Sequence, residues 1–329
     1  MKRYGWLVVA IAVAAGASSI GAQGAGQAGG RGGAPAPAQE RVDWNAKMPW
    51  GAVEKAVQAR WNGVPRTEQK TEPFKIFDNL YYVGIQHVAA YLVPTSAGLI
   101  LIDGTYGETA DMVLDNIRKL KFDPANIKYI VITHSHTDHF AGVGRIKQVA
   151  TGARIGTSAI DWAEIERQQK DGGRGAQQGG LPLTRDLVIN DGDTITLGDS
   201  VLKLYVTPGH SPGALAVELN ARAGGKTYRL ISPCVGLASV TPALTQPYIA
   251  SMERLKQLGP WDGVFASHAF LTPRDPYVGP KDFLLGPDVA PVAKRPHPAV
   301  QGVAVMDKWF DDVLKVAREK LAYEQKATN

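Results

Sequence analysis

Residues 128–144 read KYIVITHSHTDHFAGVG, and this stretch decides most of what the sequence predicts. Its first part, KYIVI, is a β-branched apolar run typical of a buried strand, and helical periodicity begins again near Gly142. Imidazole nitrogens and carboxylate oxygens are ligands that zinc accepts readily, so the loop between the two predicts a catalytic metal site. The candidate ligands on this loop are His134, His136, Asp138 and His139.

Chance does not account for this cluster. The chain holds seven histidines in 329 residues, so three at fixed offsets are expected about 0.003 times in such a sequence. The side chains of one loop, however, cannot surround two metal ions. Further ligands must therefore come from distant parts of the chain.

Two other histidines directly follow predicted strands. His210 lies in TPGHSPG, where prolines and glycines make a stiff turn, and His268 follows GVFAS. A lone histidine in a loop is more often only hydrogen-bonded. Because the cluster at 134–139 needs further ligands, we expect both histidines to be ligands. Six ligands, three per ion, would leave room for a bridging hydroxide.

THSHTDHFAG, TPGHSPG and the late histidine after a strand together resemble the metallo-β-lactamase superfamily. The resemblance spans about residues 74–323 and implies an α/β fold, a four-layer αββα sandwich of two mixed β-sheets flanked by helices. It also implies two Zn²⁺ ions as cofactors. The implied ligands are His134, His136 and His210 for the first ion, and Asp138, His139 and His268 for the second.

The same resemblance implies two further roles and a reaction. In LILIDG, Asp103 would be a buried residue that orients a metal ligand, and Asp138 would also orient the nucleophile, which makes it the catalytic residue. Histidine at position 139 is similar to the subclass B3 β-lactamases, as are FKIFDNLYYVG and a closing helix. The implied reaction is hydrolysis of a β-lactam amide by a dizinc-bound hydroxide.

Cys234, in RLISPCVGLAS, departs from the patterns of the resemblance. Glyoxalase-like hydrolases have a metal-bridging aspartate near this point, and subclass B3 usually has serines that help bind substrate. The missing aspartate argues against glyoxalase or phosphodiesterase chemistry. Cys234 is either a substrate or metal contact, as a thiolate, or a small buried residue beside the site.

Other functions remain open from the sequence. A site of this kind suits several acyl substrates, so a lactonase or thioesterase on the same scaffold is the alternative enzyme. A protein that uses the metals only for stability is the non-enzymatic alternative. His87 and His297 have no motif around them, and we interpret both as structural histidines, with a position near the pocket mouth as the alternative for His87.

The beginning of the chain predicts export. Residues 1–22 combine a basic start, an apolar stretch and small residues, as a signal peptide does, and the stretch is shorter than the ~20 residues of a membrane span. A periplasmic or secreted location without stable membrane insertion follows. Residues 23–48 are rich in Gly, Ala, Gln and Pro and predict a flexible linker. Order is expected from near Trp44 or Trp50, with the metallo-β-lactamase-like domain over 49–329.

The composition fits one globular domain with a small-molecule substrate. With 44% hydrophobic and 20% charged residues, a chain of 329 can bury a large core. The formal charge of +5 is mild, and the scattered basic residues argue against nucleic-acid binding. The one cysteine cannot form an intramolecular disulfide. Oligomeric state, substrate range and the segment 271–305 stay undetermined.

Strand and helix patterns alternate along the domain. Strand patterns over 75–85, 89–95 and 98–104 predict a meander, followed by a helix over 110–120. Two β-rich halves, each with helices, predict two sheets packed together. The later predicted elements are helices from 144 and over 160–169, five strands between 187 and 232, a helix over 249–258, a strand over 263–267 and an amphipathic helix over 306–323.

Overall fold

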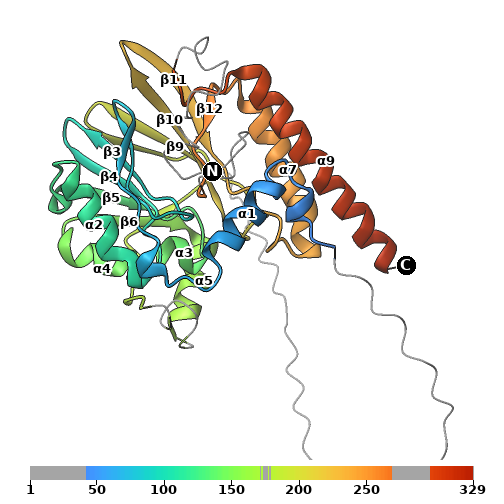
Figure 1. Cartoon of the computed structure of the whole chain (residues 1–329), viewed down its shortest axis with the longest axis horizontal. Helices are drawn as coiled ribbons and strands as arrows, with labels where there is room; N and C mark the ends of the chain where they lie inside the picture. The colour runs from blue at the N-terminus through green and yellow to red at the C-terminus, as the bar shows by residue number, and fades with distance from the viewer. Residues whose placement is uncertain (1–41, 171, 173–176, 178, 269–296, 329) are drawn as a thin grey trace, which may run out of the picture. The chain divides into compact units, whose positions relative to one another are not determined.

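Two β-sheets packed face to face form the centre of the protein. The computed structural model describes residues 42–170, 172, 177, 179–268 and 297–328. The first sheet has the strand order β1-β2-β3-β4-β5-β6-β7 and the second has β12-β11-β10-β9-β8. Helices cover the outer face of each sheet, so the layers run α, β, β, α (Figure 1). The predicted four-layer sandwich is confirmed.

The first sheet joins an antiparallel meander to a parallel half. Strands β1 to β4 pair antiparallel, and β4 to β7 pair parallel. Parallel neighbours need crossover connections, which the intervening helices supply. The strands are β1 (Phe74–Phe77), β2 (Leu80–Tyr82), β3 (Tyr91–Thr95), β4 (Gly98–Ile102), β5 (Ile127–Val131), β6 (Arg154–Ser158) and β7 (Leu187–Ile189).

The second sheet is antiparallel except for its last strand. Strands β8 to β11 pair antiparallel, and β12 pairs parallel with β11. Along β9, Leu202 and Leu204 are buried while Val201 and Lys203 are exposed, which is the period of two that a strand imposes. The strands are β8 (Thr194–Leu197), β9 (Ser200–Val206), β10 (Leu215–Ala223), β11 (Lys226–Ser232) and β12 (Gly263–Val264).

Two sets of helices form the outer layers. Helices α2 (Ala110–Lys119), α4 (Val143–Val149) and α5 (Ala159–Lys170) pack on the first sheet. Helices α1 (Gly51–Trp61), α7 (Pro242–Leu258) and α9 (Val303–Thr328) pack on the second, on the opposite side of the molecule (Figure 1). The short helices are η1 (Asn45–Lys47), η2 (Arg66–Glu68), η3 (Gly107–Thr109), η4 (Pro124–Asn126) and α3 (Thr137–Phe140).

Alternation along the strands separates the core into layers. In β4, Ile100 and Ile102 belong to the cluster between the sheets, while Leu99 and Leu101 belong to the cluster beneath α2 and α4. Both faces of this strand are therefore apolar, as expected for a central strand covered on each side. Burial on both faces holds the ends of the central strands rigidly, and those ends carry the site.

Several elements differ from the sequence prediction. The pattern over 75–85 forms two strands, β1 and β2, so the meander has four strands. Strand β7, expected in the second half, pairs with β6 in the first sheet. Helix α1 was not predicted, and α7 begins at Pro242 instead of 249. Proline is favoured at the first helical position because its missing N–H has no partner there.

The described structure begins before the predicted domain boundary at 49. Trp44 packs against the cluster under α7 and α9, and the Asn45 side chain donates to Glu54 (2.9 Å) and accepts from the Leu237 amide (2.9 Å). Met48 is buried. These contacts include residues 44–48 in the domain. The predicted signal peptide, the linker up to residue 41 and residues 269–296 of the segment 271–305 lie outside the described residues.

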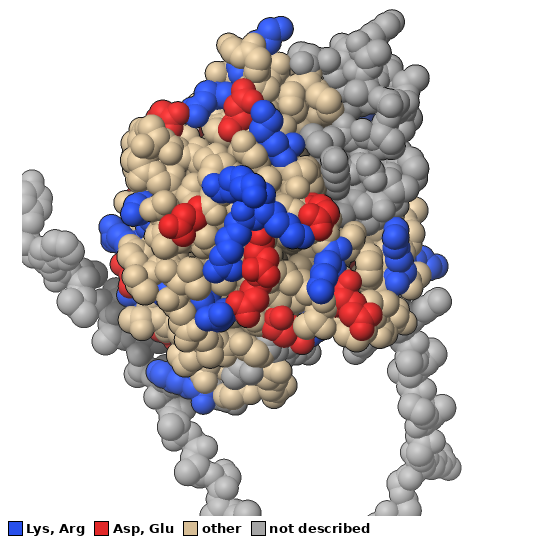
Figure 2. Space-filling view, turned by 60° about the vertical axis from the view of Figure 1, so that its left-hand side comes forward, with Lys and Arg blue, Asp and Glu red and all other residues tan. Residues whose placement is uncertain are grey.

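Charges of both signs are mixed on the face of the molecule that Figure 2 shows. Figure 2 shows Lys and Arg side chains beside Asp and Glu over one face, without a large area of one sign. Exposed ion pairs among the described residues include Arg185 with Glu166 and Arg254 with Asp191. Within the described residues, no helix is both long and apolar enough to cross a membrane.

Candidate metal centre

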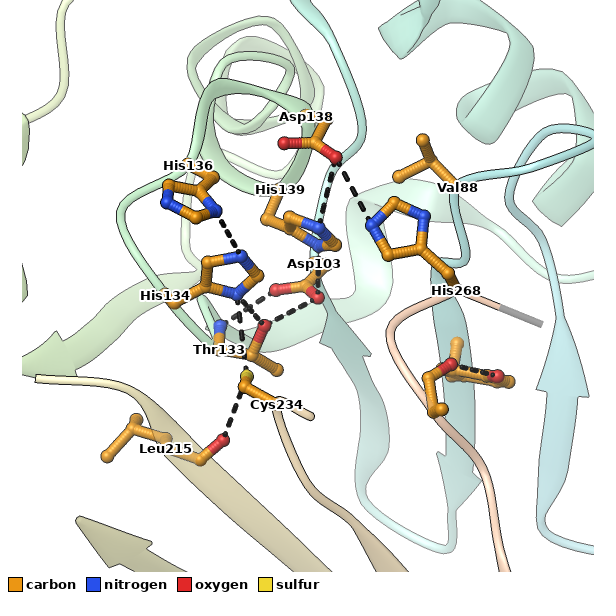
Figure 3. A network of polar contacts seen from close by, with 12 residues as sticks. Val88, Asp103, Thr133, His134, His136, Asp138, His139, Leu215, Cys234 and His268 are labelled. Atoms are coloured by element: carbon orange, nitrogen blue, oxygen red, sulfur yellow. Dashed lines mark hydrogen bonds and ion pairs between the residues drawn. The ribbon is translucent and has the colours of Figure 1, made fainter. Parts of the chain in front are cut away.

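The six predicted ligands meet at one edge of the sandwich. His134 and His136 follow the end of β5, and Asp138 and His139 lie in the short helix α3 directly after them. His210 follows β9, and His268 follows β12. Each segment thus leaves the carboxyl end of a strand, and loops from both sheets converge here (Figure 3).

The ligands form two groups of three, divided as the resemblance implies. In the first group, His134, His136 and His210 offer nitrogen atoms that all lie within 4.8 Å of one another. Each pair of these rings has a centroid distance of 4.6 Å, and His134 Nε2 is 3.1 Å from His136 Nδ1. Three imidazole lone pairs directed at one point are a typical zinc ligand set.

The second group contains one carboxylate. Asp138 Oδ2 lies 3.3 Å from His139 Nε2 and 3.4 Å from His268 Nε2 (Figure 3). The ligand atoms of this group also lie within 4.8 Å of one another. The two groups share the loop at 134–139, so two cations bound here would be close neighbours.

Four of the imidazoles are fixed through the ring nitrogen that faces away from the group. A partner on Nδ1 sets the tautomer and directs Nε2 inward, as around protein-bound zinc. The partners are Thr133 Oγ1 for His134 (3.0 Å), Asp103 Oδ2 for His139 (2.9 Å), Gly236 O for His210 (2.7 Å) and His87 O for His268 (2.7 Å).

Asp103 connects the two groups from behind. This buried carboxylate accepts hydrogen bonds from Thr133 N (2.7 Å) and Thr133 Oγ1 (2.8 Å) in addition to its contact with His139. Its φ is 62°, a left-handed value that aspartate tolerates better than most residues. The structure therefore gives Asp103 an orienting position and keeps it out of the ligand groups.

Asp161, which the sequence analysis missed, joins the two histidine loops. It accepts hydrogen bonds from Ser135 N (2.9 Å), Ser211 Oγ (2.7 Å) and Gly213 N (3.0 Å). Burial raises the pKa of Asp161, although these hydrogen bonds oppose the rise. No pattern in the sequence marks this residue, because its partners lie 26 to 52 positions away.

Close packing explains two glycines of TPGHSPG. A Cβ atom at Gly209 would lie 2.7 Å from Tyr248 Cβ, and one at Gly213 would lie 2.2 Å from Ser158 Oγ. Only glycine permits this approach. The turn that carries His210 is therefore held against both α7 and the start of α5.

The electrostatics of the groups fit a bound cation. Burial and the neighbouring imidazoles lower the pKa of His134 well below its usual value and that of His210 to about 3, so both lone pairs are available at neutral pH. Burial opposes a positive charge on His139 as well, but Asp138 and Asp103 raise its pKa to about 10. The space between these carboxylates thus favours positive charge.

One buried atom supports the same reading. His139 Nε2 makes no hydrogen bond within the described part of the chain, and its contact there is the ion pair with Asp138 Oδ2 at 3.3 Å. Buried polar atoms normally have one, and unpaired ones commonly mark a missing ligand. A bound cation would replace the proton that the two carboxylates favour on His139. Together with the neutral imidazoles of His134 and His210 and the Asp138 carboxylate, this makes the residues suitable for zinc.

Cys234 lies outside both ligand groups. Its Sγ is 3.5 Å from His134 Nδ1 and 3.6 Å from Leu215 O, behind the first group (Figure 3). The side chain is buried, and burial raises the pKa of the thiol well above its usual value. Of the two alternatives for Cys234, a substrate or metal contact and a small buried residue beside the site, this position agrees with the second.

A cavity of about 1170 Å³ opens in front of the ligands. His136, His210 and His268 line it together with residues of α1 and of the following loop. His87 and Tyr106 also line it, so His87 belongs to the cavity although the sequence gave no motif for it. His297 instead stacks on Phe77 at 4.2 Å, in agreement with a structural role.

Residues 83–222 match the family model of the metallo-beta-lactamase superfamily. These residues form a metallo-β-lactamase superfamily domain. A solved structure is similar over more of the chain. BJP-1, a subclass B3 metallo-beta-lactamase of Bradyrhizobium japonicum, is 26% identical with a TM-score of 0.64, over 80% of this chain and 98% of that chain. The resemblance drawn from the motifs is confirmed.

Curated relatives match a shorter region and differ in reaction. Mitochondrial persulfide dioxygenase ETHE1 of Homo sapiens is 31% identical over 121 residues, 37% of this chain and 38% of that protein. N-acyl homoserine lactonase AttM of Agrobacterium fabrum is 33% identical over 103 residues, 30% of this chain and 38% of that protein. The chain spans 38% of the length of these relatives, and superfamily membership alone does not select a substrate.

Proposed function

We propose that the protein is a zinc-dependent hydrolase that opens the amide of β-lactams, as a subclass B3 metallo-β-lactamase. One observation carries the proposal: the second ligand group contains His139 beside Asp138 and His268, in a chain similar to BJP-1 over 98% of that enzyme. Hydrolase chemistry itself rests on the superfamily domain and on the open cavity before the ligands.

Two zinc ions would be held by His134, His136 and His210, and by Asp138, His139 and His268, where zinc supplies Lewis acidity and lowers the pKa of bound water toward neutrality. The chain holds these ligands in place through the partners on their outer nitrogens. Asp138 uses Oδ2 toward His139 and His268. Its Oδ1 makes no hydrogen bond within the described residues, so it can accept one from the attacking water and orient it.

The carboxylate is suited to that role because it stays ionised. Burial tends to raise the pKa of Asp138, but the imidazoles of His139, His268 and His136 hold it well below its usual value. The cavity provides room for a bicyclic substrate, whose scissile carbonyl would lie beside the ligands that line it. Orientation and partial exclusion of water are therefore the contributions of this chain.

The alternative is a lactonase or thioesterase on the same scaffold. The lactonase AttM, 33% identical over 103 residues, favours this reading. Cys234 counts against the glyoxalase-like branch, because a buried thiol behind His134 cannot bridge two ions as an aspartate would.

The test is hydrolysis of a carbapenem and a cephalosporin by the zinc-loaded protein, with an acyl-homoserine lactone and a thioester in parallel. We expect β-lactam turnover that a chelator abolishes and added zinc restores. Turnover of the lactone or thioester alone would establish the alternative. His136→Ala should lose activity while its circular dichroism spectrum stays that of the wild type; loss of the fold would instead indicate a structural role for the metal.

We also propose that residues 1–22 direct export, so that the enzyme acts in the periplasm or outside the cell and protects it from antibiotics. The basic and apolar pattern of these residues supports this. Expression in a susceptible host should raise the β-lactam concentration that it survives. A chain lacking residues 1–22 should remain active in lysates but give no protection.

A further inference from the structure

His87 occupies a fixed position next to the second ligand group. It lies in the loop between β2 and β3, whose Ala89 amide donates to Ser267 O (2.9 Å). The His87 carbonyl accepts from His268 Nδ1 (2.7 Å), and the two rings stack with a centroid distance of 6.5 Å and an angle of 19°. The His87 ring is therefore held beside a ligand without being one.

The imidazole of His87 has unused hydrogen-bonding capacity. Its Nδ1 is buried without a partner, and within the described residues neither ring nitrogen makes a hydrogen bond. Such unpaired groups are uncommon and unfavourable in folded proteins unless a ligand or water completes them. Because Nδ1 is buried, Nε2 is the nitrogen that a molecule bound in the cavity lined by this ring can reach.

The wall around His87 favours an anionic partner. The Tyr106 ring lies 6.3 Å from the His87 ring, and the Arg66 guanidinium lies 4.1 Å from the Tyr106 ring centroid. All three residues line the cavity. Arg66 Nη1 also pairs with Glu108 Oε1 at 2.7 Å, which holds the guanidinium in place while offsetting part of its charge. The wall thus presents N–H and O–H donors and one cation.

We infer that His87 is a specificity-determining residue that donates a hydrogen bond to an anionic oxygen of the substrate, with Arg66 and Tyr106 behind it. The identity of that anion rests on the proposed function. Penicillins, cephalosporins and carbapenems carry a carboxylate close to the scissile amide. Bound against His87, this group would fix the β-lactam on the side of Asp138 and His268. Lactones without an anionic substituent would gain nothing from it.

Three variants separate this role from a structural one. His87→Phe keeps a ring that can stack on His268 but has no N–H, and His87→Asn restores a donor. His297→Phe is the matched control, because it makes the same change at a histidine that stacks on Phe77 outside the cavity. Zinc content and thermal midpoint are measured for each variant, because a loss of zinc in His87→Phe would indicate a structural role.

Binding is measured without turnover, by calorimetry on zinc-loaded protein. The probes are 3-mercaptopropionate and 1-propanethiol, which share a thiol that binds zinc but differ in the carboxylate. We expect His87→Phe to weaken binding of the acid about tenfold and to leave the neutral thiol unchanged. His87→Asn should recover part of the loss, and His297→Phe should resemble the wild type.

Kinetics provide the second readout. With a β-lactam that carries a carboxylate, His87→Phe should raise KM about tenfold and change kcat little, since a ground-state contact is lost. Equal weakening of both thiol probes, a loss of zinc, or no effect on the acid would each overturn the role. If the wild type hydrolyses no β-lactam but the acid-selective loss is seen, the anion site stands and the proposed function fails.

Discussion

Asp103 contacts one candidate cation site directly and the other through Thr133, so its replacement tests how the ligands are oriented. Its Oδ2 lies 2.9 Å from His139 Nδ1 and 2.8 Å from Thr133 Oγ1, and that hydroxyl lies 3.0 Å from His134 Nδ1. Asp103→Asn keeps the size of the side chain and tolerates the φ of 62°. It removes the charge that orients His139 directly and His134 only through Thr133.

The expected loss of metal affinity follows from the direct contact of Asp103 with His139 and from its indirect contact with His134 through Thr133. Loss of a residue that orients a ligand reduces metal affinity about 10- to 100-fold, or about 1.4 to 2.8 kcal/mol. We expect this loss in Asp103→Asn at the group of Asp138, His139 and His268, with a smaller loss at the other group. Thr133→Val deletes the hydroxyl at similar shape, so it should weaken the group that contains His134 and spare the other.

Stepwise zinc removal by a chromogenic chelator resolves the two affinities. Thermal unfolding of the metal-free proteins gives the control, because a lower midpoint there measures damage to the fold alone. Wild-type affinity at both sites in Asp103→Asn would refute the reasoning. Equal losses of zinc affinity at both sites in Asp103→Asn and in Thr133→Val would also refute the reasoning, because each contact would then not be specific to one site.

The remaining predictions concern groups away from the ligand atoms. Cys234→Ala should keep two zinc ions per chain, because the thiol lies behind His134; a lower zinc content by mass spectrometry would contradict this prediction. The buried wild-type thiol, whose pKa is raised, should resist iodoacetamide at pH 8 until the protein unfolds. Burial raises the pKa of Glu218, but hydrogen bonds from Arg229 (2.6 Å) and Tyr205 lower it, and the pKa in the folded protein lies below the ordinary value of 4.5. The ionised Glu218 therefore stabilises the fold above pH 4.5, and this stabilisation is lost as the pH falls through the pKa of the folded state. Urea unfolding of Glu218→Gln should therefore show a deficit of about 1 kcal/mol at pH 7 that shrinks below pH 4.5, and a deficit independent of pH would be the contrary result. Phe310→Ala, fully buried in α9, should lower the free energy of unfolding by about 3 to 5 kcal/mol, whereas Asp311→Asn in an exposed pair should cost less than about 1 kcal/mol.

The candidate metal ligands could be read from the sequence because each lies in a short motif that follows a strand. Four are within six positions of one another, and the turn around His210 is marked by prolines and glycines. Strand ends at one edge of a sandwich bring such motifs together, so the motifs and the fold predict the same site. The division into two groups came from the family resemblance, and the structure places the same residues in each group.

Other parts of the site depend on contacts that no local pattern records. Asp161 holds Ser135 and Gly213 together although it lies 26 and 52 residues from them. The strand pattern at 187–189 did not reveal its sheet, because β7 reads as an apolar run whichever neighbour it pairs with. Helix α1 escaped prediction since its apolar stripe is narrow, with Val53 and Val57 as its buried valines.

The sequence by itself determined the ligand types, their order and the αββα class, because those depend on residue chemistry and on apolar periodicity. Only the tertiary structure decided other surroundings of the ligands: Asp161 between the two histidine loops, Cys234 behind His134, and His87 at the cavity. These positions depend on how loops from different strands pack in space. The same histidine that has no motif in the sequence thus becomes, through the fold, the residue proposed to select the substrate.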